Sequence, residues 1–317
     1  MLGDQNKYRM LNTMDENTFP NVNDIKVISS GALKKKRMNP NFKEGQFSVN
    51  DLFRFKDLIG TGGFSSVYAA SCNYSNSKST LAIKVLEDSR MTTESEQKHF
   101  RNELKIMQSL HHPSIIKLNG YYKESSKHYL VMEYISGGDL LDDIVKNGSY
   151  DEFRGRQIAY SLIDAVKYMH SNGIAHRDLK PENILLSMHH ECDIKIADFG
   201  FSTRFNGPNS LTTMCGTPGF IAPEVLNGKR YDAAVDIWSL GVTIYIIFAG
   251  YQPFQEEDDE RRSLQIKRGD YSFPKEFRWR DISSSCIHFI KSLMTVSPEI
   301  RPTAHGALKH EWFSNNL

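Results

Sequence analysis

Two periods of apolar residues divide the chain into a part that favours strands and a part that favours helices. Between residues 53 and 135, apolar residues recur in short runs of strand length. Within this part, 95–110 instead places Phe100, Leu104 and Met107 near the 3.6-residue period of an amphipathic helix. After Gly137-Gly138 the helical period dominates. The pattern predicts an α+β fold with two lobes: a small sheet-rich lobe with one helix, and a larger, mainly helical lobe.

The predicted elements follow from these runs. Strands are expected at 53–55, 66–70, 80–86, 115–118, 129–134 and 194–197. Helices are expected at 95–110, 139–146, 153–171, 233–249, 258–268, 283–294 and 303–312. We therefore predict a small lobe at 51–135 and a large lobe at 136–317.

Residues 1–50 lack both periods. They are rich in Asn and carry more basic than acidic residues, which predicts a flexible leader. Its basic run, Lys34–Arg37, is open to four interpretations: a solvated tail, a nuclear address, a docking element or a self-binding segment.

Composition limits the class of protein further. The 317 residues carry a net charge of +1, which gives no general attraction to nucleic acid or to a membrane. The longest apolar run, 237–250, is too short to cross a bilayer. The 4 cysteines have no C-x-x-C spacing and are expected to be free thiols in a reducing compartment. We expect a cytoplasmic protein without membrane or nucleic-acid partners, and the basic run leaves the nucleus open.

Two features of the strand-rich part suggest phosphate binding. Gly60, Gly62 and Gly63 precede Val67 in a turn where backbone amides could approach phosphates, although an ordinary hairpin turn has the same pattern. Lys84 closes an apolar strand, where its ammonium could bind anionic oxygens. Glu103, on the predicted helix, could pair with this lysine, unless both are surface charges.

Four motifs in the second half are far more specific. They are His176-Arg177-Asp178-Leu179-Lys180-Pro181-Glu182-Asn183, Asp198-Phe199-Gly200, Gly216-Thr217-Pro218 and Ala222-Pro223-Glu224. In this order, and with the glycine turn and Lys84, they resemble the signature of eukaryotic protein kinases over about residues 53–313. The glycine turn, in which Ser65 replaces the family's third glycine, and the ending 308–313 resemble the calcium/calmodulin-dependent kinase group. The chain is thus identified as a member of that group.

The resemblance implies a bilobal serine/threonine kinase, with a small antiparallel-sheet lobe and a larger helical lobe, that uses ATP and magnesium. Asp178 would accept the proton of the substrate hydroxyl, and Lys180 would steady the γ-phosphate. Asn183 and Asp198 would bind magnesium, since their oxygens suit a hard cation. Lys84 would bind the α- and β-phosphates with Glu103 as its partner. The other implied ATP contacts are Ile59, Gly60, Gly62, Gly63, Val67, Ala82, the gatekeeper Met132, the backbones of Glu133 and Ile135, Asp139 at the ribose, and Leu185.

The resemblance also implies how structural pairs, substrates and the activation loop behave. Asp236 would brace the catalytic loop, and Glu224 would pair with Arg301. Glu182 and Asp139 would bind an arginine at the third position before the phosphosite. A second acidic run lies at 256–260, which is alternatively a solvated helix start. Thr217 is assigned to the substrate site, and Phe201 favours Ser over Thr as the acceptor. Thr213 is the expected phosphosite, paired with Arg177 and modified by an upstream kinase or by autophosphorylation.

Two rival functions and one form of control stay open at this point. A pseudokinase scaffold would lack one of the catalytic residue types, but Lys84, Asp178, Asn183 and Asp198 are all present. A small-molecule kinase would not need the peptide-site residues Lys180 and Arg301. Related kinases carry an inhibitory, calmodulin-binding helix after the final kinase helix, and neither that element nor an EF-hand occurs in these 317 residues. Control by calmodulin or another calcium sensor is therefore an open expectation.

Overall fold

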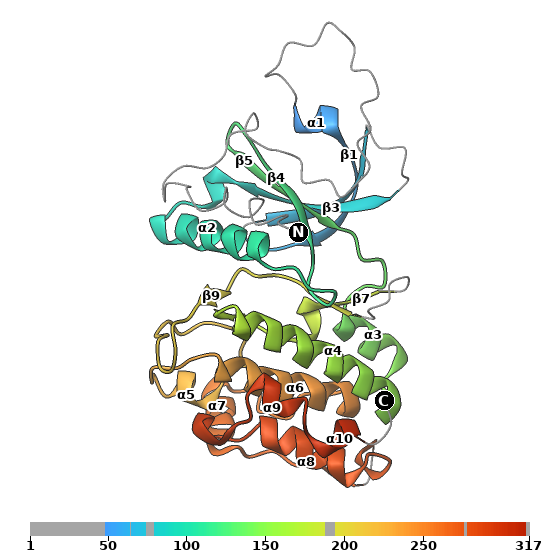
Figure 1. Cartoon of the computed structure of the whole chain (residues 1–317), viewed down its shortest axis with the longest axis vertical. Helices are drawn as coiled ribbons and strands as arrows, with labels where there is room; N and C mark the ends of the chain where they lie inside the picture. The colour runs from blue at the N-terminus through green and yellow to red at the C-terminus, as the bar shows by residue number, and fades with distance from the viewer. Residues whose placement is uncertain (1–47, 64, 74–78, 188–193, 276–277, 315–317) are drawn as a thin grey trace, which may run out of the picture. The chain divides into compact units, whose positions relative to one another are not determined.

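The computed structural model describes residues 48–63, 65–73, 79–187, 194–275 and 278–314 (Figure 1). These residues divide into two compact units. The first consists of the described residues up to Met91 together with Leu118–Met132, and the second of Thr92–Lys117 and the described residues from Glu133 onward. The basic run Lys34–Arg37 and most of the predicted leader lie outside the described residues.

The first unit is built on a five-stranded sheet with the order β1-β2-β3-β5-β4 (Figure 1). Its elements are the helix α1 (Val49–Leu52) and the strands β1 (Phe53–Thr61), β2 (Ser65–Cys72), β3 (Thr80–Glu87), β4 (Leu118–Glu124) and β5 (Lys127–Glu133). The pairs β1–β2, β2–β3 and β4–β5 are antiparallel. The register places Val67 opposite Lys84 and Ala69 opposite Ala82.

The two faces of this sheet carry different residues. One face supports a hydrophobic core of Val49, Phe53, Ala70, Ile83, Tyr122 and Val131. Helix α1 adds Val49 to this core and begins with a capping box, in which Ser48 and Asp51 bond each other's backbone amides. Because successive residues of a strand point to opposite faces, Val67, Ala82 and Lys84 share the other face. The predicted phosphate and adenine contacts of β2 and β3 therefore lie together.

The second unit is mainly helical, with two small two-stranded sheets, β6-β9 and β7-β8. Its helices are α2 (Glu94–Ser109), α3 (Leu140–Asn147), α4 (Glu152–Ser171), α5 (Pro223–Leu226), α6 (Ala234–Ala249), α7 (Asp259–Arg268), α8 (Ser284–Leu293), α9 (Ala304–Ala307) and α10 (Glu311–Ser314). Its strands are β6 (Ile174–Ala175), β7 (Ile184–Leu186), β8 (Ile194–Ile196) and β9 (Thr203–Arg204). The 3-10 helix Pro181–Asn183 precedes β7.

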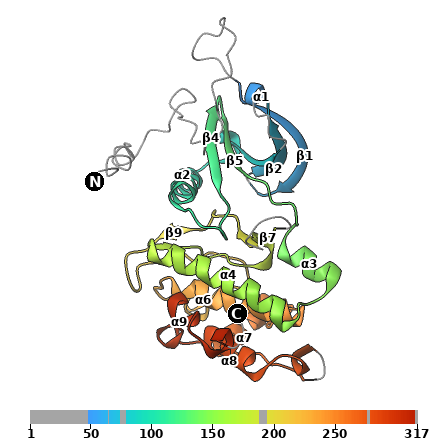
Figure 2. The ribbon, with the colours of Figure 1, turned by 45° about the vertical axis from the view of Figure 1, so that its right-hand side comes forward.

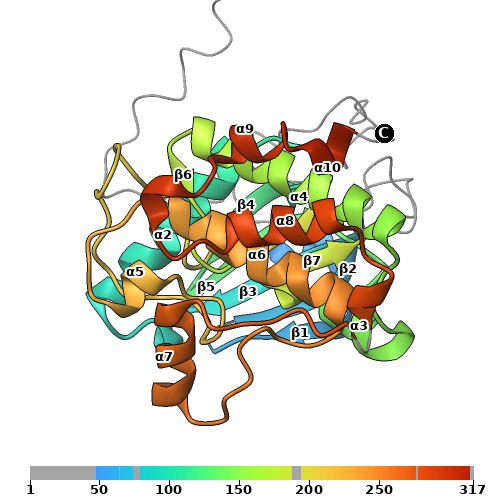
Figure 3. The ribbon, with the colours of Figure 1, turned by 90° about the horizontal axis from the view of Figure 1, so that it is seen from below.

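Helix α6 forms the centre of the second unit. Every residue from Val235 to Ala249 is buried, because α6 packs between α4 and α8 (Figures 2 and 3). Gly241 allows α6 to approach α8, since a Cβ at this position would lie 2.6 Å from Cγ of Met294. A buried helix at this place gives the loops around it a rigid support.

The predicted α+β fold with a sheet-rich and a helical part is confirmed, but some details differ. The predicted strand 115–118 is only an isolated bridge between Ile115 and Ile196, and β4 begins at Leu118. The predicted helix 303–312 is interrupted between α9 and α10, where Nδ1 of His310 accepts a bond from the amide of Trp312 and starts a new turn. No helix in the described part of the chain has both the length and the apolar character of a membrane span.

The compact units also differ from the predicted lobe ranges of 51–135 and 136–317. Helix α2 and the segment up to Lys117 group with the helical unit. Asn102 of α2 donates a 2.7 Å bond to the carbonyl of Ser202, beside β9. The amide of Ile116 donates to the carbonyl of Ile196 in the same unit. These contacts with distant segments, which no local pattern reveals, explain the difference.

A buried histidine makes the stability of the first unit dependent on pH. His128 is 2% exposed and lies between the hydroxyl of Tyr121 and the carboxylate of Asp88, each 2.7 Å away. Burial lowers the pKa of His128 from its ordinary value of 6.5, although Asp88 opposes this. The unfolded chain therefore binds the proton more readily than the folded chain. We expect the free energy of unfolding to fall as the pH drops from 7.5 to 5.5, and to fall less in His128→Gln.

Urea unfolding at pH 7.5, 6.5 and 5.5 measures this dependence. His99→Gln serves as the control, because His99 is an exposed histidine on α2. A pH dependence that is equally steep in His128→Gln and His99→Gln would contradict the prediction.

Candidate active site

The segment around the first motif is held by a buried carboxylate. Asp236, in the first turn of α6, is fully buried and accepts bonds from the amides of His176 (2.9 Å) and Arg177 (2.7 Å). Nε2 of His170 lies 2.8 Å from the same carboxylate. Burial would raise the pKa of Asp236, but these hydrogen bonds and nearby positive charge outweigh it and hold the pKa below its usual value. Asp236 therefore stays charged and fixes the loop on the central helix.

Asp178 receives donors from three directions. Its side chain is 3% exposed, and Oδ1 accepts from the amide (2.9 Å) and the hydroxyl (2.7 Å) of Thr217. Its Oδ2 accepts from Nδ2 of Asn183 (3.0 Å) and lies 3.3 Å from Nζ of Lys180. Lys180 also donates a 2.7 Å bond to the hydroxyl of Thr217. The structure thus brings the predicted catalytic residues Asp178 and Lys180 together with Asn183 and Thr217.

Asn183 and Asp198 offer oxygen atoms of the kind that magnesium prefers. Nδ2 of Asn183 donates to the backbone and the side chain of Asp178, so its Oδ1 is the atom that remains to bind a cation. The carbonyl of Asn183 accepts from the amide of Ala197, which places Asp198 one residue beyond this bond. Asp198 is exposed and has a positive φ of 56°, a strained conformation that is common at functional sites. Amide and carboxylate oxygens in this arrangement fit a magnesium ion that keeps water and phosphate ligands.

Glu133, the last residue of β5, is predicted to bind ATP through its backbone, while its side chain bonds other protein atoms. Oε1 of Glu133 accepts from the amide of Lys117 (2.7 Å) and from Nζ of Lys195 (2.8 Å). Asp139 caps α3 by accepting a 2.8 Å bond from the amide of Asp142, and its backbone bridges Leu185. Ile135, between them, is half-buried. The predicted contacts Glu133, Ile135, Asp139 and Leu185 thus all belong to the helical unit.

The first unit carries the other predicted ATP contacts. The amide of Gly62 donates to the carbonyl of Ser65 and closes the turn between β1 and β2. A Cβ on Gly63 would meet no atom within 4 Å, so glycine leaves open space there rather than relieving a close contact. Val67 lies opposite both Gly60 and Lys84 in the sheet. The remaining contacts in this unit are Ile59, which is 44% exposed, the buried Ala82 and the half-buried Met132. Glu103, on α2 of the second unit, is 5% exposed.

Of the predicted substrate and regulatory residues, Glu182 and Thr213 lie on the surface of the helical unit. Glu182 is exposed in the 3-10 helix that follows Lys180, and Thr213 is exposed in the loop before Gly216. Behind this loop, Glu224 and Arg301 form a buried bidentate pair with bonds of 2.7 and 2.6 Å. A residue that the sequence analysis missed, Tyr231, contacts both Arg177 and the backbone of Thr213. It carries no sequence signal, since a tyrosine between polar residues has no distinguishing pattern.

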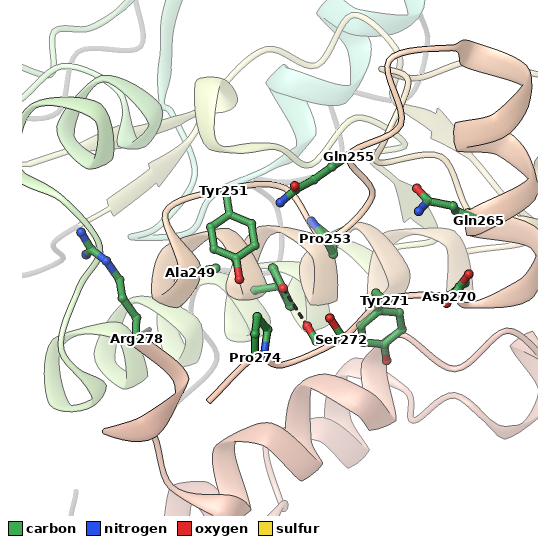
Figure 4. A pocket seen from close by; sticks show the side chains of 11 residues that line it. Ala249, Tyr251, Pro253, Gln255, Gln265, Asp270, Tyr271, Ser272, Pro274 and Arg278 are labelled. Carbon is green, nitrogen blue, oxygen red and sulfur yellow. Dashed lines mark hydrogen bonds between the residues drawn. The ribbon is translucent and has the colours of Figure 1, made fainter. Parts of the chain in front are cut away.

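A concave region of the helical unit contains none of the predicted catalytic or ATP-binding residues. It is a cavity of about 750 Å³ lined by the three tyrosines Tyr245, Tyr251 and Tyr271 and by prolines (Figure 4). A neighbouring cavity of about 430 Å³ shares Gln255 and Gln265 with it. This neighbour is lined by the acidic residues Glu256, Glu257 and Asp258. Part of the second acidic run thus borders a hollow on the surface instead of only starting α7.

Comparison with known proteins agrees with this geometry. Residues 53–313 match the family model described as a protein kinase domain. The chain is 39% identical to a calcium/calmodulin-dependent protein kinase type 1 from Caenorhabditis briggsae over 282 residues, which cover 89% of this chain and 78% of the relative. The protein of the same name from Macrobrachium nipponense is 40% identical over 284 residues, with 89% and 81% covered. Myosin light chain kinase A from Dictyostelium discoideum is 39% identical over 269 residues, with 84% and 90% covered.

Proposed function

Because the chain belongs to the protein kinase family, as a serine/threonine kinase of the calcium/calmodulin-dependent group, we propose that it transfers the γ-phosphoryl of magnesium-ATP to protein substrates. The acceptors are Ser or Thr residues that follow basic residues. The observation that carries the proposal is the convergence of Lys180, Asn183 and Thr217 on the carboxylate of Asp178. This arrangement provides an oriented base beside the cation Lys180 and beside one candidate metal ligand, Asn183.

Each residue of the site would have its own role in such a transfer. Asp178 would accept the hydrogen bond of the substrate hydroxyl and take its proton as the oxygen attacks. Thr217 and Asn183 orient this carboxylate through their own bonds to it. Lys180, 3.3 Å from Asp178, would place its positive charge where negative charge develops during transfer. Magnesium-ATP, when bound, supplies the phosphoryl group and neutralises charge on its oxygens.

The alternative of a pseudokinase scaffold has less support. A scaffold would need nucleotide or partner binding only, and nothing in that role calls for a base held by four donors. The bonds between Asp178, Asn183 and Thr217 would then have no use. Turnover is therefore the better explanation of this geometry.

The exposed carboxylates of the helical unit support a preference for arginine at the third position before the phosphosite. Glu182 lies two residues after Lys180 and is exposed, so it can pair with a guanidinium. We extend this role to Asp139 and to Glu256, Glu257 and Asp258 at the cavity rim. The half-exposed Phe201, next to Gly200, supports serine as the better acceptor.

We expect Glu182→Gln to reduce kcat/KM for an Arg-x-x-Ser peptide about 10- to 100-fold, since a hydrogen bond between charged groups is lost. The rate with the matching Ala-x-x-Ser peptide should change less than threefold, so that the arginine preference disappears. Asp281→Asn, which alters an exposed carboxylate on the same unit, is the control and should keep the preference. An unchanged preference in Glu182→Gln would remove this residue from the substrate site.

Regulation forms the last part of the proposal. Phosphorylation of Thr213, by an upstream kinase or by the protein itself, would place a phosphate near Arg177. Two of the relatives are named calcium/calmodulin-dependent. We extend calcium-sensor control to this chain as part of the proposal, although no calmodulin-binding helix was recognised in these 317 residues, and rates measured with and without calcium and calmodulin test it.

A further inference from the structure

The guanidinium of Arg177 is the meeting point of two distant segments. Its Nε donates a 2.7 Å bond to the carbonyl of Phe201, three residues after Asp198. Its Nη1 donates a 3.0 Å bond to the hydroxyl of Tyr231, which precedes α6. Its backbone amide is fixed by Asp236, and its φ is +70°. The side chain thus starts from a rigid, strained position directly before Asp178.

Tyr231 continues this chain of bonds into the activation loop. Its hydroxyl donates a 2.5 Å bond to the carbonyl of Thr213. A hydroxyl both accepts and donates, so it can join a cationic donor to a carbonyl acceptor. Burial raises the pKa of Tyr231, against the opposing effect of Arg177, so the phenol keeps its proton. Phenylalanine would fill the same space and leave both partners without this bond.

The backbone of the same tyrosine also holds the loop. Tyr231 and Leu211 exchange two backbone bonds, of 2.9 and 3.0 Å, and Tyr231 is only 3% exposed. On the far side of Thr213, Gly216 has a φ of 110°, and a Cβ there would lie 2.8 Å from the carbonyl of Arg177. The next residue, Thr217, bonds Asp178. The loop is therefore fastened on both sides of Thr213, close to the catalytic carboxylate.

We infer that Tyr231 is a positioning residue that holds the loop around Thr213 on Arg177, so that the site is assembled before Thr213 is phosphorylated. This inference rests on the proposed kinase function and concerns the regulation of the same site. The bridge runs from the guanidinium of Arg177 through the hydroxyl of Tyr231 to the carbonyl of Thr213, and every bond in it joins protein atoms. The two bonds of Arg177 use Nε and Nη1, which leaves the Nη2 side of its guanidinium for a phosphate on Thr213. Tyr231 and the phosphate thus stabilise the same ordered loop.

The bonds of Tyr231 and a phosphate on Thr213 would both stabilise the ordered loop, so the effect of one depends on whether the other is present. When Tyr231 already holds the loop in most molecules, a phosphate on Thr213 can add little activity. When the hydroxyl of Tyr231 is removed, the ordered fraction falls and the phosphate has more to restore. The structure therefore predicts a small activation by phosphorylation in the natural chain and a large one in Tyr231→Phe.

The test combines Tyr231→Phe with phosphothreonine introduced at position 213 during translation. In the unphosphorylated protein, Tyr231→Phe should lower kcat/KM for an Arg-x-x-Ser peptide about 10- to 100-fold, because a buried donor and acceptor lose their partner. The KM for ATP should change less than threefold. Phosphothreonine at 213 should raise the kcat/KM of the natural chain less than tenfold. In Tyr231→Phe it should raise kcat/KM to within threefold of the value for the phosphorylated natural chain.

Tyr245→Phe is the matched control, since Tyr245 is also buried and donates its hydroxyl to one carbonyl, that of Ser272, at 2.8 Å (dashed line in Figure 4). It should keep natural activity. If Tyr231→Phe behaves like this control, or if its loss is not restored by phosphothreonine, the inference is wrong. Hydrogen exchange of 205–216 gives a readout without catalysis: faster exchange in Tyr231→Phe than in Tyr245→Phe supports the bridge, and equal exchange refutes it. A natural chain without any transfer would refute the kinase proposal and leave the exchange result to judge the bridge.

Discussion

Asp178→Asn should lower kcat for phosphoryl transfer about 10²- to 10⁴-fold, which is the usual effect of losing a general base. The carboxylate of Asp178 accepts from Thr217 through Oδ1, and from Asn183 and Lys180 through Oδ2. An asparagine must turn its NH₂ group toward one of these pairs of donors, and it cannot take the proton of the substrate hydroxyl. The KM for ATP should change much less than kcat. Steady-state rates with an Arg-x-x-Ser peptide measure both.

The control for Asp178→Asn is Asp151→Asn. Asp151 is exposed and caps α4 by accepting a 2.8 Å bond from the amide of Arg154, and asparagine caps helices equally well. Activity should therefore stay within twofold of the natural chain. If Asp178→Asn kept more than a tenth of the natural kcat while remaining folded, Asp178 would not be the base.

Arg301→Lys should lower the free energy of unfolding by about 2–5 kcal/mol, because lysine keeps the charge but leaves at least two buried acceptors without a donor, at about 1–3 kcal/mol each. Both partners are buried, and Arg301 binds both oxygens of Glu224 at 2.7 and 2.6 Å. It also donates to the carbonyls of Ala234, Thr295 and Val296. A lysine has three donors on one nitrogen and cannot reproduce this fork of five bonds. The midpoint of urea unfolding should fall clearly.

Arg280→Lys is the matched control for this prediction. Arg280 forms a surface pair with Asp281 and its side chain is 78% exposed, so the change should cost less than about 0.5 kcal/mol. A loss below about 1 kcal/mol in Arg301→Lys would mean that the pair with Glu224 does not anchor the loop behind the site.

The sequence predicted the long elements well because each carries a local signal: α4 has a helical period of apolar residues, and α6 contains a long apolar run. The predicted helices 153–171 and 233–249 differ by one residue from α4 and α6. The elements that it did not predict are short: α1 rests on the capping bonds of Ser48, and β6 and β9 exist only because Ile174 and Ala175 pair with residues about 30 positions away. A two-residue strand has no period. It could be recognised only from its partner.

The contacts of the candidate site also differ in how well the sequence predicts them. The motif 176–183 placed Asp178, Lys180 and Asn183 within eight residues, so their proximity follows from the chain itself. The bonds of Thr217 to Asp178 and of Tyr231 to Arg177 span 39 and 54 residues. Asp236 was predicted only through the family resemblance, although its bonds to His176 and Arg177 fix the whole loop. Such contacts depend on the conformation that the loops adopt around α6, and no local sequence pattern specifies this conformation.

The most direct test of the central claim is transfer of labelled γ-phosphate from magnesium-ATP to peptides that differ only in the acceptor, Ser, Thr or Tyr, after Arg-x-x. The natural chain and Asp178→Asn are compared at equal concentration. We predict labelled phosphoserine, less phosphothreonine and no phosphotyrosine with the natural chain, and almost no label with Asp178→Asn. Equal labelling by both proteins, or label on tyrosine alone, would contradict the assignment of this site as a serine/threonine kinase centre built on Asp178.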